Sequence, residues 1–211
     1  MKVVAINGSS RKNGNTAIAL DAVCRVLNEN DIETERIEIG SNALHGCTGC
    51  GYCGREKNRR CIFDNDLLNG CLETLFEADG ILIGSPVYYT GVNGALKCFL
   101  DRAFFVASGN GSLFRHKVGA ALVAVRRGGE IAAWDQLNKY FTISEMFIPS
   151  SFYWNMVFGS APGEAEQDVE GMHTMQVLGE NMAWLLKNVE QGKQIAPLPP
   201  QVEKRRMNFI R

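Results

Sequence analysis

The chain has 211 residues, of which 45% are apolar and 21% charged, and its formal net charge at pH 7 is −1. This is the composition of an ordinary globular protein, and the length suits one α/β domain. The small net charge gives no field that would favour nucleic acid or an anionic membrane surface. No apolar run reaches the roughly 18 residues of a membrane span, and the start of the chain lacks the apolar region of a signal peptide. We therefore expect a cytoplasmic protein with no nucleic-acid or membrane partner.

Strand-like and helix-like segments alternate along the chain. In chain order they are strand 2–7, helix 16–28, strand 34–39, helix 65–78, strand 80–84, helix 92–106, strand 117–125, helix 130–144, strand 152–158 and helix 167–191. Asp64 or Asn65 would cap the second helix. Alternation of this kind predicts parallel strands joined by right-handed crossovers, with helices on both faces of the sheet. Five strands favour a doubly wound sheet in the order 2-1-3-4-5.

The last expected helix carries an apolar stripe at helical spacing, which we interpret as core. Its members are Met172, Met175, Leu178, Met182, Leu185 and Val189. We expect one domain over residues 1–195, with a cysteine-rich loop at 45–63 and a C-terminal tail at 196–211. The tail would lie on the surface or reach a neighbouring subunit.

In a doubly wound sheet, ligands bind beyond the carboxyl ends of the strands, so the loop after strand 2–7 is the first candidate site. Its small hydroxyl and amide residues lead into a helix N-terminus, and its arginine adds a charge-assisted donor; both favour an anion. The candidate residues are Ser9, Ser10, Arg11, Asn13, Asn15 and Thr16. Neither Gly-x-Gly-x-x-Gly nor Gly-Lys-Ser/Thr occurs here, so a terminal monophosphate fits better than a dinucleotide or a nucleoside triphosphate. The alternative is an ordinary helix-capping loop.

Two further loops at the same edge offer a surface for an aromatic ring. The loop after strand 80–84 contains a proline and two tyrosines, whose flat, amphipathic rings suit such a ligand. Its candidate residues are Pro86, Val87, Tyr88, Tyr89, Thr90 and Gly91. The loop after strand 117–125 adds Arg127, Gly128 and Gly129, where glycines permit close backbone approach. Each loop alone could be an ordinary turn, and only their convergence favours a binding site.

Four of the seven cysteines form a compact motif, Cys47-x2-Cys50-x2-Cys53-x7-Cys61. The motif follows strand 34–39, so we expect it at the same edge of the sheet as the three loops above. Four thiolates in so short a loop can surround one 4Fe–4S cluster, whose negative charge the nearby basic residues would offset. A zinc site, a redox disulfide and a loop with no metal remain alternatives, although zinc sites commonly use two separated cysteine pairs. The other three cysteines, Cys24, Cys71 and Cys98, stand singly among apolar neighbours and need no chemical role.

These motifs together resemble the NADPH-dependent FMN reductase family. The resemblance rests on Gly-Ser-Ser-Arg-x-x-Gly-Asn-Thr, on Gly-Ser-Pro-Val-Tyr-Tyr, and on Lys97 followed by Asp101-Arg102. The cysteine motif is similar to that of the iron–sulfur flavoproteins within this family. The resemblance covers residues 1 to about 190. It implies a flavodoxin-like fold and FMN, with the phosphate on residues 9–16 and the isoalloxazine against residues 86–91 and near 127–129. It also implies a homo-oligomer with a flavin near a subunit interface. We expect a homodimer or homotetramer, because the aromatic run Phe152-Tyr153-Trp154 and the pair Phe104-Phe105 exceed what one small domain needs for its core; plain packing is the alternative.

We therefore expect an FMN-dependent oxidoreductase, linked to NAD(P)H or ferredoxin, whose 4Fe–4S cluster exchanges single electrons with FMN. Because a flavin supplies the hydride chemistry itself, no catalytic side chain is assigned. His45, His116 and His173 have no acid or nucleophile partner in sequence and are interpreted as surface or packing residues. One alternative is a cluster-free reductase of free flavin, quinone, nitro or azo compounds. Another is a non-enzymatic electron carrier like flavodoxin, or a metal-stapled interaction module.

Overall fold

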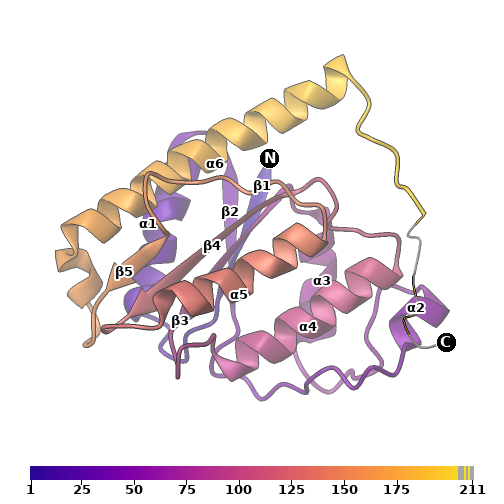
Figure 1. The fold of residues 1–211 in the computed structure, drawn as a ribbon, viewed down its shortest axis with the longest axis horizontal. Coiled ribbons are helices and arrows are strands. Elements are labelled where there is room, and N and C mark those ends of the chain that lie inside the picture. Colours follow the sequence, from indigo (N-terminus) through magenta and orange to yellow (C-terminus); the bar gives the residue numbers. More distant parts are fainter. Residues whose placement is uncertain (204–206, 208, 210–211) are drawn as a thin grey trace.

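The computed structural model describes residues 1–203, 207 and 209; the basic triplet at 204–206 in the expected tail lies outside the described residues. The elements in chain order are β1 (Lys2–Asn7), α1 (Asn15–Glu29), β2 (Glu33–Glu38), α2 (Tyr52–Glu56), α3 (Leu68–Glu77), β3 (Gly80–Pro86), α4 (Gly94–Gly109), β4 (Val118–Val125), α5 (Glu130–Ile143), β5 (Met156–Phe158), the 3₁₀ helix η1 (Glu164–Gln167) and α6 (Val169–Ile195). Figure 1 shows how they are arranged.

The five strands form one parallel sheet in the order β2-β1-β3-β4-β5. The predicted doubly wound topology is thereby confirmed. All five strands end at the same edge, so the loops that follow them share that edge of the sheet. The strand order reverses its direction between β1 and β3. The loop after β1 leads to a helix on one face of the sheet, and the loop after β3 leads to a helix on the other face.

Helices cover both faces of the sheet: α1 and α6 pack on one, and α3, α4 and α5 on the other (Figure 1). Successive residues of β1 therefore alternate between two buried cores. Val3 and Ala5 face α1 and α6, whereas Val4 and Ile6 face the opposite helices. Burial on both faces explains why the central strands are apolar throughout rather than alternating with polar residues.

Helix α6 lies across α1 and buries the predicted apolar stripe. Met175, Leu178 and Met182 are inaccessible to solvent, and Met172, Leu185 and Val189 pack at the margin of the same core. The stripe is therefore structural, as the sequence predicted. No helix within the described part of the chain has both the length and the apolar character of a membrane span.

Several element boundaries differ from the prediction. Helix α3 begins only at Leu68, and its first N–H bonds to the Asp66 side chain rather than to Asp64 or Asn65. The expected strand 152–158 is confined to Met156–Phe158, because the aromatic residues before it lie outside the sheet. The short helix α2 inside the cysteine segment was not predicted, since five residues carry no periodic signal.

The chain turns after β2 at Gly40, which lies against the backbone of the loop after β1. A Cβ added at Gly40 would stand 2.3 Å from the Gly8 carbonyl oxygen and 2.2 Å from the Ser9 carbonyl carbon. Neither neighbour is a flexible side chain, so a substitution must displace the backbone. By contrast, a Cβ at Gly70 in α3 would meet nothing within 4 Å.

We predict that Gly40→Ala lowers the free energy of unfolding by about 1–3 kcal/mol, the usual cost of overpacking. Gly70→Ala is the matched control and should stabilise the protein by about 0.5–1 kcal/mol, because alanine is the better helix former. The measurement is the urea midpoint of each variant against the parent. Equal midpoints for Gly40→Ala and the parent would contradict the close approach at Gly40.

Candidate functional site

The loops at the carboxyl edge of the sheet contact one another. The hydroxyl of Ser10, after β1, lies 3.3 Å from the hydroxyl of Tyr88, after β3. Gly129, at the start of α5, packs so closely on Thr90 that a Cβ there would be 2.9 Å from the Thr90 Cα. Arg11 donates to the carbonyl oxygen of Ser160, which follows β5, at 3.3 Å. The three loops predicted from sequence therefore form one continuous surface.

The loop at residues 8–14, here called the phosphate loop, is held by side chains that bond its own backbone. The Asn7 side chain accepts from the Ser9 N–H at 3.0 Å and donates to Glu38 at 2.8 Å. The Ser9 hydroxyl accepts from the Arg11 N–H at 3.1 Å. Helix α1, which follows, has no side-chain cap and no acidic residue in its first turn. Its first N–H groups and its positive dipole end are suited to an anion.

The predicted phosphate-loop residues fall into two groups. Ser10, Arg11 and Asn13 are exposed, whereas Ser9, Asn15 and Thr16 are buried. The Asn15 side chain accepts from the N–H groups of Gly163 and Ala165 at 3.1 and 3.2 Å and donates to Ala161 at 3.0 Å. It thus ties the loop before α6 to the phosphate loop, a role that sequence reasoning missed.

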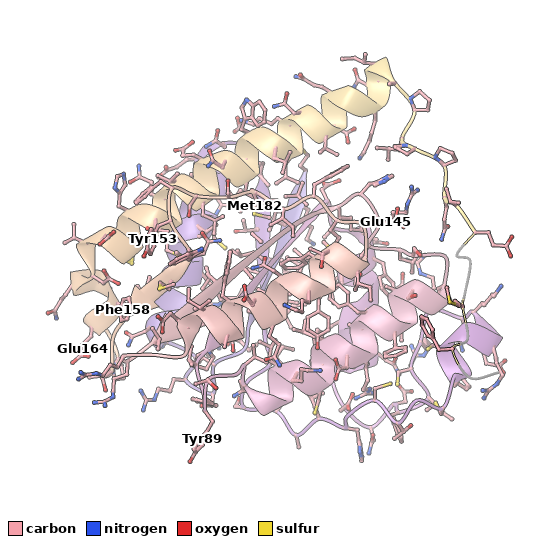
Figure 2. All side chains as sticks on the ribbon, in the orientation of Figure 1. Tyr89, Glu145, Tyr153, Phe158, Glu164 and Met182 are labelled. Atoms are coloured by element: carbon pink, nitrogen blue, oxygen red, sulfur yellow. The ribbon has the colours of Figure 1, made fainter. Side chains whose placement is uncertain are left out.

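The loop after β3 forms a tight turn that presents Tyr89 to solvent. Tyr88 and Gly91 exchange two backbone hydrogen bonds of 2.9 Å, and the two residues between them have left-handed φ angles of 49° and 62°. Such conformations cost about 1–3 kcal/mol each in non-glycine residues and cluster at functional sites. The Tyr89 side chain is fully exposed and projects away from the body of the protein (Figure 2).

The other predicted loop residues frame this turn. Pro86 ends β3, and the Val87 N–H bonds to the carbonyl oxygen of Ala124 in β4 at 3.0 Å. Arg127 and Gly128 are exposed at the opposite side of the turn. Gly129 has φ 92° and precedes α5, which again lacks a side-chain cap. The backbone around Tyr89 is thereby anchored on both sides, and the side chains of Tyr88 and Tyr89 remain exposed.

The four motif cysteines line one cavity of about 80 Å³, although the first two are exposed and the last two half-buried. Its lining side chains are Cys47, Cys50, Cys53, Cys61, Thr48, Tyr52, Ile62, Phe63, Arg102, Phe105 and Val106. Among the described residues, no three His, Cys, Asp or Glu side chains are placed to bind a single metal ion. The fold thus gathers the four thiols around a common space without bringing three of them onto one point.

The cavity is held in shape by two asparagines that bond the cysteine segment. Asn69 of α3 accepts from the Cys61 N–H at 2.8 Å and donates to the Cys61 carbonyl oxygen at 3.0 Å. Asn110, which ends α4, accepts from the Arg59 N–H at 2.9 Å and donates to the Cys53 carbonyl oxygen at 3.2 Å. Sequence reasoning missed both asparagines: Asn110 lies more than 50 residues from the groups it bonds, and Asn69 bonds across a segment without periodicity.

Arg102 is a third residue of this site that the sequence reasoning left without a role. It lies in α4 with only 1% of its side chain exposed, and its Nε donates to the Cys61 sulfur at 3.3 Å. Its helical neighbours Phe99, Ala103 and Phe104 belong to the core. The sequence contains one signal for this residue, namely an arginine at a position of the helix where its neighbours are apolar.

The cysteine cavity lies elsewhere than expected. The motif was predicted at the edge of the flavin loops, because it follows β2. Instead, Cys53 bonds the carbonyl oxygen of Phe105, and Gly54 packs on Gly109, at the C-terminal end of α4. Since α4 begins at the carboxyl edge of the sheet with Gly94, the Gly94–Phe105 stretch separates the cysteine cavity from that edge by about 16 Å along the helix. The connection after β2 is long enough to run along α4 (Figure 1).

The thiols differ in acidity. A hydrogen bond from the Tyr52 backbone lowers the pKa of Cys50, and Thr48 and Arg55 reinforce the effect. Burial raises the pKa of Cys53, and the nearby sulfurs of Cys61 and Cys47 raise it further. Because the thiolate is the form that binds metal, the lowered pKa favours ligation by Cys50 over ligation by Cys53.

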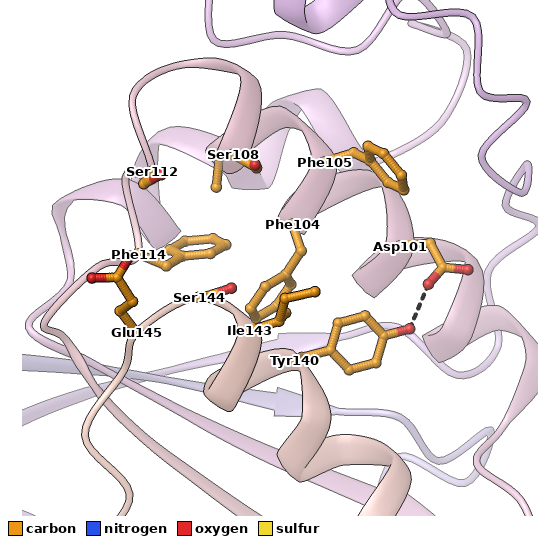
Figure 3. A pocket seen from close by; sticks show the side chains of 11 residues that line it. Asp101, Phe104, Phe105, Ser108, Ser112, Phe114, Tyr140, Ile143, Ser144 and Glu145 are labelled. Atoms are coloured by element: carbon orange, nitrogen blue, oxygen red, sulfur yellow. Dashed lines mark hydrogen bonds between the residues drawn. The ribbon is translucent and has the colours of Figure 1, made fainter. Parts of the chain in front are cut away.

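A second cavity of about 250 Å³ lies between α4 and α5 (Figure 3). Its wall is mostly apolar, and its polar side contains Tyr140, whose hydroxyl donates to Asp101 at 2.5 Å. Burial and this hydrogen bond raise the pKa of Tyr140. Lys97 pairs with the same carboxylate at 2.6 Å. Exposed Phe105 lines both this cavity and the cysteine cavity.

The three histidines are surface or packing residues, as predicted, and His45 and His173 are exposed. His45 stacks on Phe63, His116 stacks on Phe147, and His173 packs at a tilt against Phe152. The isolated cysteines also have no special environment: Cys24 is buried, which raises its pKa to about 11, and the other two are half-buried.

Comparison with known proteins gives consistent matches. The family model of NADPH-dependent FMN reductases matches residues 1–161. An iron–sulfur flavoprotein of Methanocaldococcus jannaschii is 35% identical over 198 residues, which cover 90% of this chain and 100% of that protein. An iron–sulfur flavoprotein of Methanosarcina thermophila is 29% identical over 196 residues, which cover 92% of this chain and 99% of that protein.

Solved structures share the fold at low identity. RosB with bound 8-demethyl-8-formylriboflavin-5'-phosphate superposes with a TM-score of 0.68 at 16% identity, covering 100% of this chain and 92% of RosB. A WrbA-like flavodoxin from Agrobacterium tumefaciens gives 0.59 at 17% identity, covering 90% of this chain and 98% of that one. Together with the sheet order and the contacting loops, these matches confirm the resemblance seen in the sequence. The chain belongs to the NADPH-dependent FMN reductase family and, within it, to the iron–sulfur flavoproteins.

Proposed function

We propose that this FMN-dependent oxidoreductase binds FMN at the carboxyl edge of its sheet and a 4Fe–4S cluster at Cys47, Cys50, Cys53 and Cys61. Electrons would pass between NAD(P)H or ferredoxin and a one-electron partner. The observation that carries the proposal is that the four cysteines line one cavity. Cys47 and Cys61, the first and the last of them, are 14 positions apart in the sequence. The family match supplies the flavin half of the proposal.

The phosphate loop fits a flavin phosphate. Uncapped N–H groups open α1, no carboxylate stands in its first turn, and exposed Arg11 lies beside them. A dianionic monophosphate would be stabilised there by backbone donors and by the helix dipole. The solved structure of RosB contains a riboflavin phosphate, which supports a flavin phosphate as ligand of this fold.

The turn at Tyr88–Gly91 and the loop at 126–129 fit the flavin ring. Exposed tyrosine side chains lie beside the glycines of the second loop, joined by the packing of Gly129 on Thr90. The N-termini of α4 and α5 both face this edge, and their dipoles would stabilise negative charge on the reduced ring. These residues would bind and orient the ring, and bound FMN would supply hydride acceptance and single-electron release.

The cysteine cavity fits a cluster better than a zinc ion. Four sulfurs around one zinc ion lie about 3.8 Å apart, given Zn–S bonds of about 2.3 Å in a tetrahedron. A cubane occupies the space between its ligands, so its four sulfurs stand further apart. The four described cysteines surround one cavity, and four thiols around a common space are the ligand set of a cubane.

A homodimer or homotetramer is part of the proposal. Phe152, Tyr153 and Trp154 are each about half exposed, and Phe105 is 58% exposed, whereas Phe104 belongs to the core. An aromatic surface of this kind is typical of an interface. The separation of the two sites along α4 gives a second reason, since a neighbouring copy could bring its own flavin edge closer to the cysteine cavity.

We predict that protein purified without oxygen contains FMN, about four irons and about four acid-labile sulfides per chain. The visible spectrum should show flavin and iron–sulfur absorption together. Chromatography of the heat-released flavin identifies it, and FAD as the main species would contradict the monophosphate site. Flavin without iron would favour the cluster-free reductase instead.

We predict that Arg11→Ala weakens FMN binding about tenfold to a hundredfold, because hydrogen bonds to charged groups contribute about 1.5–3 kcal/mol. Riboflavin, which lacks the phosphate, should bind mutant and parent alike. Arg25→Ala, an exposed arginine on the outer face of α1, is the matched control. Titration of both ligands decides the matter, and equal losses for FMN and riboflavin would show that Arg11 does not recognise phosphate.

We predict that Cys53→Ser makes the cluster labile or absent while FMN binding is retained, because the flavin loops lie on other segments. Hydride transfer from NAD(P)H to FMN, where the parent shows it, should persist, and reduction of ferredoxin or a cytochrome should fall sharply. Cys71→Ser, outside the cavity, serves as the control. The measurement is paired two-electron and one-electron rates on oxygen-free preparations. Full retention of both by Cys53→Ser would exclude the cysteine loop from the electron path.

A further inference from the structure

One buried guanidinium contacts both ends of the cysteine segment. Arg102 donates through Nη1 to the carbonyl oxygen of His45 at 3.3 Å, and through Nη2 to that of Phe63 at 3.0 Å. These two carbonyls stand just before Cys47 and just after Cys61. The third nitrogen, Nε, donates to the Cys61 sulfur at 3.3 Å. A single side chain of α4 therefore closes the loop and bonds one of its thiols.

The charge of this side chain is balanced within the same cluster of residues. Nη1 of Arg102 also donates to Asp66, and the two side chains are 1% and 4% exposed. Asp66 in turn accepts from the Leu68 N–H at 3.1 Å and from the His45 N–H at 3.5 Å. A buried charge pair is costly unless its remaining donors and acceptors are satisfied, and here the guanidinium uses all three nitrogens.

The shape of the guanidinium matters as much as its charge. Its planar fork presents N–H donors in fixed directions. The His45 carbonyl, the Phe63 carbonyl and the Cys61 sulfur each accept one of these N–H groups. A lysine ammonium could keep the charge but could not reach His45, Phe63 and Cys61 together. The Phe63 ring, which stacks on His45, also lies under the guanidinium at 5.6 Å from its carbon.

The geometry points to Arg102 as a positioning residue that pre-shapes the cysteine loop and, through its N–H bond to Cys61, raises the reduction potential of the cluster. Only the statement about the reduction potential rests on the proposed function, because it requires a bound cluster. Reduction adds one negative charge to a cluster, and hydrogen bonds to its sulfurs favour the more negative state. Loss of the donor therefore lowers the potential. Loss of the compensating Asp66 charge raises it, since the guanidinium then acts unopposed.

The test compares Arg102→Lys and Asp66→Asn with the parent and with Arg115→Lys. Arg115 is an arginine that pairs with Glu145 away from the cysteine cavity. The first readout is the midpoint potential of the cluster, followed by electron paramagnetic resonance on oxygen-free protein. We expect Arg102→Lys to weaken the reduced state relative to the oxidised state about tenfold, which is about 59 mV for one electron. Asp66→Asn should shift the potential the opposite way, and Arg115→Lys should leave it unchanged.

The second readout needs no cluster. Hydrogen–deuterium exchange across residues 45–63 of the iron-free protein should be at least tenfold faster in Arg102→Lys than in the parent and Arg115→Lys. Iron-free parent protein after anaerobic purification would overturn the cluster proposal, while the exchange rates would still decide the positioning role. Parent-like potential and parent-like exchange in Arg102→Lys would overturn the inference about Arg102. If Arg102→Lys loses its cluster, the potential is tested with Asp66→Asn alone. A lowered or unchanged midpoint potential in Asp66→Asn would then overturn the inferred effect of Arg102 on the potential.

Discussion

The parallel direction of all five strands is the constraint on which the rest of the structure depends. A parallel strand must be followed by a crossover, so every loop that leaves the carboxyl edge either opens a helix or travels the length of the domain. The loops after β1, β3 and β4 open α1, α4 and α5 directly. Three helix N-termini therefore face one edge, where their dipoles favour an anionic, electron-rich ligand. The connection after β2 is the exception, and it is the segment that carries the four cysteines.

The sequence was sufficient for the fold and for the convergence of the three loops at one edge, because both follow from short-range signals. Strand and helix periods identify the elements, and the topological rule for open sheets then places their loops. The cysteine segment has no such periodicity. Its path depends on left-handed backbone at Lys57 and Arg59 and on the bonds that Arg102 and Asn110 make to distant main-chain groups. Contacts of this type join residues far apart in the chain and have no local signature, so the segment was placed at the wrong edge.

Asn15 illustrates the same limit on a smaller scale. Its position at the start of a helix after β1 suggested a ligand contact, but the side chain is occupied by the loop before α6. A polar side chain in such a motif can bind a ligand or can hold the loop that binds it. The two roles are distinguished only by the group that the side chain hydrogen-bonds in the folded structure. Ser10 and Arg11, in contrast, remain exposed at the edge, as a ligand contact requires.

The placement of the cysteines at the far end of α4 creates an electrostatic problem that the buried arginine addresses. The C-terminus of α4 carries the negative end of its dipole, and thiolates or an anionic cluster there would be disfavoured. Two arginines of the segment give little help, because Arg59 pairs with Glu73 at 2.9 Å and Arg60 with Asp64 at 2.7 Å. Arg102 lies two turns before the helix end and directs an N–H at a cysteine sulfur from the low-dielectric interior, where such a bond is stronger than at the surface. The carboxylate of Asp66 moderates that charge. On the role inferred for Arg102, this buried pair, together with Arg55 beside Cys50, would determine how readily negative charge accumulates in the cavity.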